Sequence, residues 1–391
     1  MWLMTSKKRI YTLALLVPII AFIVISGFFS QAMTRDDTFR HLAVFNDVVS
    51  IVLKNYVEEV DITPAVEGAM RGLSEALDSD SAYLTQELVQ SIIANDSLGK
   101  ADIGLDVIRQ YYLRVVSALD GSPAARAGLK PGDYVRFIDG KVTRHMASLE
   151  GMQLLQGAPG TTVKLLVFRG NANESHTVEL IREELENAKI QSRIASTGVG
   201  YIRIPEFRKD TPVLLQENFQ ELSKAGAKNF IVDLRGTSRG DFDYGIAAAR
   251  LFVKSGTLTI QQFRERDNEV ISSDMSDGNL TAPVILLINN GTSGAAEIFA
   301  AALNHHDRAS LIGQQSLGRV AQQKLVALPD GSGLWISYLR YLMPNGDQLH
   351  ERGLTPDIKI EEPDLEFGET PLQDSVLEKA IEQSTEVQLA A

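Results

Sequence analysis

Few side chains in this sequence are suited to covalent or metal chemistry. The chain has no cysteine, which excludes thiolate nucleophiles, disulfides and cysteine zinc sites together. It also has no H-E-x-x-H motif, no cluster of metal ligands and no phosphate-binding glycine loop, so no metal or other cofactor is expected. Serine chemistry remains, in which a base must take the hydroxyl proton before the oxygen can attack. Serine is the nucleophile left for such chemistry, with histidine or lysine as the base, and Ser293, His305, His306 and Lys324 are among the residues of these types.

Distance along the chain argues against the two histidines as bases. A helix is expected over residues 295–304, and His305 and His306 lie about three turns from its start. They are expected to be surface or packing histidines. Ser293 is expected to serve as the N-cap of the same helix, a role that serine often fills.

The helix over residues 295–304 belongs to an alternating pattern in the second half of the chain. Strand-like and helical runs alternate there, with strands expected at 200–204, 229–234 and 284–289, and helices at 213–225, 244–253 and 295–304. This alternation is typical of a mostly parallel sheet covered by helices. We expect this α/β core over residues 187–362. An acidic tail over residues 363–391 is expected to form a surface helix with a frayed end.

Two smaller domains are expected before the core, as the length of 391 residues allows. Residues 97–186 have short strand-like runs between Gly and Pro turns, with strands expected at 112–118, 134–138 and 162–168. Residues 36–96 are helical in pattern. A first helix has an apolar stripe, and a second is expected from Thr63, as N-cap, to about Asp78. The apolar stripe consists of Leu42, Phe45, Val48, Val49 and Val52.

The N-terminal segment predicts the compartment. Three cations at positions 7–9 precede an uncharged stretch over residues 10–29, which at about 1.5 Å per residue can cross a hydrocarbon core of about 30 Å. The positive-inside rule places the cations in the cytoplasm and the rest of the chain on the far side. We expect residues 1–35 to be a signal anchor at the inner membrane, facing the periplasm or another extracytoplasmic side. Ser30 and Ala32 are small residues at the positions expected of a signal peptidase site, so the alternative is cleavage after Ala32 and secretion.

The charge of the chain excludes one class of partner. The formal net charge is -12 and no basic patch stands out, whereas binding to nucleic acid relies on clustered Lys and Arg. Nucleic acid is therefore not expected as a partner. No motif in the sequence predicts an oligomeric state.

One segment resembles a known peptide-binding module. Asp120-Gly-Ser-Pro-Ala-Ala-Arg-Ala-Gly-Leu-Lys-Pro-Gly-Asp133 is similar to the S-P-A-x-x-A-G-L-x-x-G-D fragment of PDZ domains. The resemblance implies a β-barrel-like domain that adds a peptide C-terminus to a sheet edge and holds the terminal carboxylate with loop amides. The binding residues would be Ile103, Gly104, Leu105 and Asp106. Asp102 stands where related proteases usually have glycine, and the alternative is a module that only packs against the core.

Further segments resemble the C-terminal processing (tail-specific) serine peptidases. The pattern L-D-P-H-S-x-Y-L is matched by Leu77-Asp-Ser-Asp-Ser-Ala-Tyr83-Leu84, and I-L-D-L-R by Ile231-Val-Asp-Leu-Arg235. Gly200-Tyr-Ile-Arg-Ile-Pro-Glu-Phe207, Tyr341-Leu-Met-Pro-Asn-Gly346 and Gly353-Leu-Thr-Pro-Asp357 match three more patterns in the same order. The resemblance spans nearly the whole chain after the N-terminal segment. It implies an α/β core of the ClpP/crotonase-like type.

The resemblance also locates the residues that should cleave peptides. In the family the nucleophile is the middle serine of S-A-S-A-S-E, and the base is the lysine of T-F-G-K-G. The matching positions here are Gly294, which has no side chain, and Arg319, which stays protonated. Gln323, four positions after the base, is retained. Arg319 is expected to fill the vacated space, for instance by an ion pair with Glu297.

The turn that should hold the oxyanion departs from the family pattern as well. The pattern N-x-P-G-G is replaced by Gly236-Thr-Ser-Arg-Gly240, with Arg239 at the first glycine of the pair. If that glycine has a positive φ, arginine would deform the turn. Lys324 is a poor substitute base, since in one strand it would face the side opposite to Arg319.

These observations favour a silent member of the family. We expect an envelope protein that binds peptide C-termini or partner proteins through its PDZ module and degenerate cleft. The alternative is an active serine endopeptidase that cleaves near protein C-termini with a rearranged site at Ser293. A structural scaffold that binds nothing is the third reading.

Overall fold

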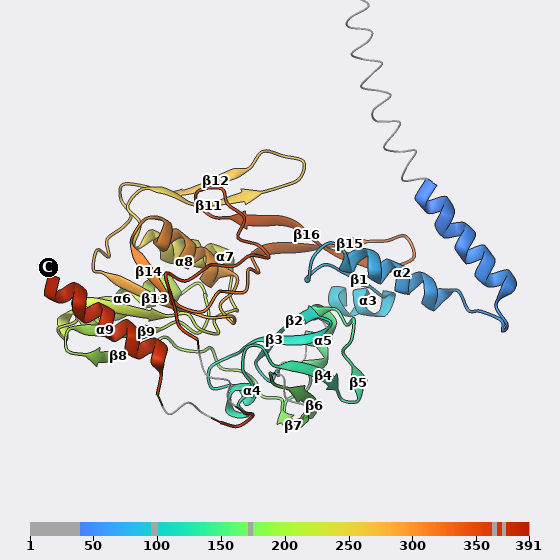
Figure 1. Ribbon diagram of the computed structural model, residues 1–391, viewed down its shortest axis with the longest axis horizontal. Helices are drawn as coiled ribbons and strands as arrows, with labels where there is room; N and C mark the ends of the chain where they lie inside the picture. Colours follow the sequence, from blue (N-terminus) through green and yellow to red (C-terminus); the bar gives the residue numbers. More distant parts are fainter. Residues whose placement is uncertain (1–39, 95–100, 171–174, 362–365, 370–372, 391) are drawn as a thin grey trace, which may run out of the picture. The chain divides into compact units, whose positions relative to one another are not determined.

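A computed structural model describes residues 40–94, 101–170, 175–361, 366–369 and 373–390 (Figure 1). The chain divides into two units, Met1–Met70 and Arg71–Ala391, which we describe separately. The expected anchor over residues 10–29 and the expected cleavage site at Ala32 lie outside the described residues. Within the described ranges, no helix is both long and apolar enough to span a bilayer.

The first unit is helical where it is described. Residues 40–55 form one helix, and the predicted apolar stripe lies along it with Leu42, Phe45 and Val48 exposed. The next helix, α2 (Thr63–Glu75), begins in this unit and ends in the second. Thr63 is the first helical residue and donates its backbone N–H to Asp61 Oδ1 (2.9 Å), so the capping carboxylate is that of Asp61. The expectation of Thr63 as N-cap was wrong.

The PDZ-like domain has a six-stranded antiparallel sheet of order β2-β3-β4-β6-β7, with β5 paired to β4. The three predicted strands are confirmed with their predicted bounds as β3, β4 and β6. Alternate apolar residues of these strands, including Val115, Val135 and Val167, are buried in one core. The elements are β2 (Leu105–Gln110), β3 (Tyr112–Ala118), α4 (Pro123–Arg126), β4 (Tyr134–Ile138), β5 (Lys141–Val142), α5 (Ser148–Leu155), β6 (Thr162–Phe168) and β7 (Ser175–Ile181).

The predicted α/β core contains a second six-stranded sheet of order β17-β14-β13-β10-β9-β8. All its neighbours run parallel except β8 and β9. The mostly parallel sheet expected from the alternating pattern is therefore confirmed. Its elements are β8 (Gln191–Ser196), β9 (Val199–Arg203), α6 (Thr211–Lys224), β10 (Asn229–Asp233), α7 (Phe242–Arg250), β13 (Val284–Ile288), α8 (Ala295–His305), β14 (Ala309–Gly313), β17 (Ile358–Lys359) and α9 (Ser375–Ala390).

The two faces of this sheet bury different helices, because successive side chains of a strand point to opposite faces. Phe230 and Val232 of β10 share a core with α6, α7 and α8. Ile231, between them, packs with Val376 and Ala380 of α9. The acidic tail thus includes a surface helix, as expected, but one face of that helix is buried against the sheet.

A third, antiparallel sheet pairs a strand near the start of the second unit with strands from later in the chain. Its order is β1-β16-β11-β12, and β15 also pairs with β16. Because β16 pairs with both β1 and β15, one strand fixes the register of two segments that are far apart in sequence. The elements are β1 (Ala82–Leu84), α3 (Gln86–Ala94), β11 (Gly256–Gln262), β12 (Glu269–Ser273), β15 (Ala321–Ala327) and β16 (Gly333–Leu342).

Candidate functional site

The turn from β13 into α8 has the backbone of a nucleophile elbow but no nucleophile. Gly294 lies directly before the helix with φ +65° and ψ -125°, a conformation that residues with a side chain rarely adopt. Such a strained strand-to-helix turn is the one that exposes a catalytic serine in other hydrolases. A Cβ at Gly294 would lie 3.6 Å from the Ser238 carbonyl oxygen, so the turn has room for a side chain. Gly294 therefore has the backbone geometry of such a turn and no side chain that could react.

Glu297 holds this turn against the loop that carries the base position. Its carboxylate is fully buried and accepts the backbone N–H of Gly294 (3.1 Å) and of Arg319 (2.9 Å). It also accepts the N–H of Gly318 (2.6 Å) and the hydroxyl of Ser316 (2.5 Å). Burial raises the pKa of Glu297 to about 7, although the four donated hydrogen bonds oppose that shift. One buried carboxyl group thus ties the elbow to the loop before β15.

The side chain of Arg319 forms ion pairs with two other carboxylates. Its Nε donates to Asp80 Oδ1 (2.8 Å) and its Nη1 donates to Asp106 Oδ1 (3.1 Å). Burial disfavours the charge, but the two carboxylates outweigh it and raise the pKa of Arg319. The expected ion pair with Glu297 was wrong, because Glu297 accepts only the backbone N–H. Arg319 is therefore a fixed cation that no physiological pH converts into a base.

Asp80 and Asp106 were not identified from the sequence as partners of Arg319. Asp80 directly precedes Ser81 and β1, and Asp106 lies on β2 of the PDZ-like domain. Asp80 stands at the histidine of the L-D-P-H-S-x-Y-L pattern, so two departures from that family pattern meet in one ion pair. The exchange of histidine for aspartate was the available signal.

Ser293 is buried and has no base. Its backbone N–H donates to the Thr237 carbonyl (2.9 Å), and its side chain is 1% exposed. Among the described residues, no hydrogen bond links its hydroxyl to a lysine or histidine. The expected N-cap role was wrong, because Gly294 occupies the N-cap position and Glu297 accepts the N–H of that residue.

The remaining candidate bases are engaged elsewhere. Lys324 is exposed, with Nζ 5.3 Å from the ring centroid of Tyr338. Arg319 lies before β15, whereas Lys324 lies in it. The expectation that the two side chains face opposite sides of one strand therefore does not apply. No hydrogen bond links Lys324 to Ser293 among the described residues. His306 Nε2 is 2.7 Å from the Thr257 carbonyl oxygen, and His305 is exposed. The Gln323 side chain, in β15, donates to the Ala321 carbonyl oxygen and to Ser337 Oγ of the neighbouring strand β16.

The turn over residues 236–240, at the position expected for the oxyanion, accommodates Arg239 between two glycines of positive φ. Gly236 (φ +65°) and Gly240 (φ +126°) have positive φ, whereas Arg239 does not. The condition under which arginine would deform the turn is therefore not met. The N–H of Gly236 donates to Asn289 Oδ1 (2.9 Å). A Cβ at Gly240 would lie 2.2 Å from the Phe207 carbonyl oxygen, so only glycine fits there. The Arg239 side chain points to the PDZ-like domain instead.

The predicted peptide-binding loop faces this altered turn. Arg239 Nη2 donates to Asp102 Oδ2 (3.0 Å) and to the Leu105 carbonyl (3.3 Å). Ser238 Oγ donates to Asp106 Oδ2 (2.6 Å). Ile103 and Gly104 lie between these contacts, and β2 begins at Leu105. The structure thus brings the predicted peptide-binding and oxyanion residues together.

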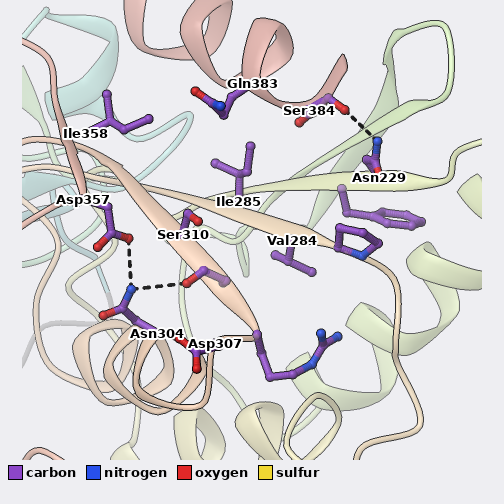
Figure 2. A pocket seen from close by; sticks show the side chains of 14 residues that line it. Asn229, Val284, Ile285, Asn304, Asp307, Ser310, Asp357, Ile358, Gln383 and Ser384 are labelled. Carbon is purple, nitrogen blue, oxygen red and sulfur yellow. Dashed lines mark hydrogen bonds between the residues drawn. The ribbon is translucent and has the colours of Figure 1, made fainter. Parts of the chain in front are cut away.

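An open pocket lies on another part of the core. A pocket of about 590 Å³ is lined by the first residues of β10, β13 and β14 and by α9 (Figure 2). Asn304 Nδ2 donates to Asp357 there (3.0 Å), and Asn229 Nδ2 to the Ser384 carbonyl (2.8 Å). Ligands of open α/β sheets bind beyond the carboxyl ends of strands. Gly294 follows that end of β13, whereas the pocket is lined by the first residues of the strands, so the pocket and the turn at Gly294 are separate. Among the described residues, no group of three His, Asp or Glu side chains is arranged to hold a metal ion.

Comparison with known proteins agrees with this architecture. Residues 198–360 match the profile of peptidase family S41, and residues 114–169 match that of the PDZ domain. The chain is 30% identical over 348 residues to the carboxy-terminal processing protease CtpA of Bacillus subtilis, covering 88% of this chain and 73% of that protein. It is 29% identical over 362 residues to a carboxy-terminal-processing protease of Bartonella bacilliformis, covering 88% and 83% respectively.

A solved structure shows the same likeness. The photosystem II D1 C-terminal processing protease superposes with a TM-score of 0.68 at 25% sequence identity. The match covers 81% of this chain and 86% of that one.

Proposed function

The chain belongs to peptidase family S41, and within that family we propose that it is a catalytically silent member that recognises the C-termini of other proteins through its PDZ domain. The observation that carries the proposal is the ion pair of Arg319 with Asp80 and Asp106. The base position holds a permanent cation that two carboxylates keep in place. This arrangement supports a site that has been rebuilt as a structural contact.

Each chemical step of peptide cleavage lacks a group that could perform it. Gly294 has no oxygen to attack a carbonyl, and Arg319 cannot take a proton. The nearby Ser293 has a hydroxyl, but its candidate base Lys324 lies over Tyr338. An activated serine needs a base within hydrogen-bond reach, so an active enzyme centred on Ser293 is the weaker alternative.

Recognition of C-termini is supported by the loop before β2. PDZ domains add a tail as a strand to a sheet edge, and β2 is an edge strand of the PDZ sheet, with α5 packed against it. Gly104 has φ +77°, and a Cβ there would lie 2.2 Å from the Ser122 Cβ. Only glycine therefore keeps the amides of this loop in place.

Binding to a labelled peptide tests this proposal. The full-length chain is titrated against an unstructured peptide with an apolar C-terminal residue, followed by fluorescence anisotropy. We expect saturable binding that Gly104→Ala weakens at least tenfold. The matched control is Gly160→Ala, also at positive φ (+79°) but with open space around its Cβ, and it should bind as the wild type does. Tail recognition is wrong if the wild type shows no saturation or if both variants behave alike.

We further propose that the chain works in the cell envelope. The support is the cationic start and apolar stretch over residues 10–29, with Ala32 as the site of release if the segment is cleaved. Cell fractionation combined with an intact-mass measurement distinguishes the membrane-anchored chain from the chain cleaved after Ala32. A chain found in the cytosol with its first residues intact would contradict the proposal.

A further inference from the structure

Asp102 places a carboxylate of the chain itself in the loop that should receive the carboxylate of a tail. Its Oδ1 accepts the N–H of Ile103 (2.7 Å), and its Oδ2 accepts from Arg239 Nη2 (3.0 Å). Resting on the proposed recognition of C-termini, we infer that Arg239 is the cation that holds the tail carboxylate, and that Asp102 occupies its place while no tail is bound. The receptor site would then be built from both domains.

The position of Arg239 relative to β2 supports this assignment. Leu119 donates its N–H to the Gly104 carbonyl (2.8 Å), which makes Leu105 and Ala118 a non-hydrogen-bonded pair of the β2–β3 ladder. The N–H and C=O of Leu105 therefore point away from β3, toward the edge where a tail would pair. Arg239 Nη2 donates to that carbonyl (3.3 Å). The guanidinium thus lies at the outer edge of β2, beside the loop.

The loop amides complete the site. The carbonyls of Ile103 and Gly104 accept from Ala124 (2.9 Å) and Leu119, which fixes the loop on its inner side. In the described part of the chain, no acceptor receives the N–H of Gly104. Asp102 takes the neighbouring amide of Ile103. The N–H of Gly104 is thus available to a tail carboxylate, and the N–H of Ile103 would become available when the Asp102 carboxylate is displaced.

The exposure of the pair allows that exchange. The side chain of Arg239 is 26% exposed and that of Asp102 is 16% exposed, so water and a competing carboxylate can reach them. A tail carboxylate would replace one charge-assisted contact to Arg239 with another, and it would release Asp102. Asp102 therefore lowers the affinity for tails, while Arg239 raises it for tails that end in a free carboxylate. Both residues stand where the family pattern has glycine, and the structure shows that these two departures contact each other.

The test compares two forms of one peptide on four forms of the full-length chain. The peptide carries either a free C-terminal carboxylate or a C-terminal carboxamide, and the chains are wild type, Arg239→Ala, Asp102→Ala and the control Lys164→Ala. Lys164 forms an exposed ion pair with Glu179 on the same domain, away from the loop. The readout is the ratio of affinities for carboxylate over carboxamide.

We expect Arg239→Ala to lower this ratio about tenfold, the effect of one charge-assisted contact. Asp102→Ala should raise affinity for the carboxylate form several-fold, and Lys164→Ala should change neither quantity. Unchanged ratios in Arg239→Ala, with wild-type binding intact, overturn the role of Arg239 but leave tail recognition standing. If neither wild type nor Asp102→Ala binds any tail, the proposed function itself fails.

Discussion

Arg319 and Asp80 are 239 residues apart in the sequence, yet Arg319 Nε lies 2.8 Å from Asp80 Oδ1. The carboxylate of Asp80 is 3% exposed, and Asp106 contacts the same guanidinium from the PDZ domain. The contact joins the segment before β1, the loop before β15 and strand β2. A position that would hold the catalytic base therefore stabilises the arrangement of three segments.

Removing this cation should destabilise the fold. Arg319→Met leaves the buried carboxylates of Asp80 and Asp106 without their counter-ion, and we expect a loss of about 3 kcal/mol in the free energy of unfolding. Adding Asp80→Asn should recover at least about 1 kcal/mol, because the two residues interact directly. Denaturant unfolding measures both. Arg266→Met, which removes an exposed pair with Glu269, serves as control and should cost under about 0.5 kcal/mol. Equal losses for both arginines would contradict this account.

The elbow at Gly294 should resist a side chain because of its backbone, not for lack of room. With φ +65° and ψ -125°, Gly294→Ser is expected to cost about 1–2 kcal/mol of stability through backbone strain. The control is Gly72→Ser in α2, where no positive φ is required and no atom lies within 4 Å of a Cβ. It should cost nothing measurable by thermal or denaturant unfolding. A neutral Gly294→Ser would mean that the turn relaxes to accept the side chain.

Restoring the two missing side chains alone should not restore cleavage. In the double variant Gly294→Ser/Arg319→Lys, the carboxylates of Asp80 and Asp106 would keep the introduced amine protonated, and a protonated amine is not a base. We expect turnover of a tail reporter at background, and turnover above background only when both carboxylates are also removed, by Asp80→His and Asp106→Asn. Cleavage by the double variant would show that the carboxylates do not block the base.

Glu297 should make stability depend on pH. Its pKa in the folded chain is about 7, above the ordinary 4.5, so between these values the folded chain holds a proton that the unfolded chain has released. Stability should therefore fall as pH rises through this window, by up to about 3 kcal/mol. Glu297→Gln should be less stable overall, since an amide offers fewer acceptors, but with a flatter slope over the same window. The exposed Glu221→Gln is the control. An unchanged slope in Glu297→Gln would assign the pH dependence to another group.

Local patterns predicted the elements of the fold closely. The bounds of β3, β4 and β6 agree with those expected, because alternating apolar residues end there at Gly and Pro turns. The helix after Gly294 begins at Ala295 as predicted. These features depend on a few neighbouring residues, and the sequence displays them directly.

The contacts of the site depend on long-range register, which the sequence does not display. Arg319 meets Asp80 because β16 pairs with both β1 and β15. Glu297 rather than Ser293 caps α8, since its buried carboxylate reaches back from the third helical residue to the N–H of Gly294. Arg239 turns toward Asp102, a partner 137 residues away. The sequence displays glycine and arginine at the positions that match the family's serine and lysine, Gly294 and Arg319, but it does not display the contacts around them.

The most direct test of the central claim is a cleavage assay on the intact chain. Full-length protein and the Ser293→Ala variant are incubated with an unstructured reporter that ends in an apolar residue, beside an S41 peptidase that retains its serine and lysine. We predict that the wild type binds the reporter and leaves it uncut, with rates indistinguishable from Ser293→Ala. Turnover by the wild type that vanishes in Ser293→Ala would contradict the account, and would show that the site has rebuilt its nucleophile one residue before Gly294.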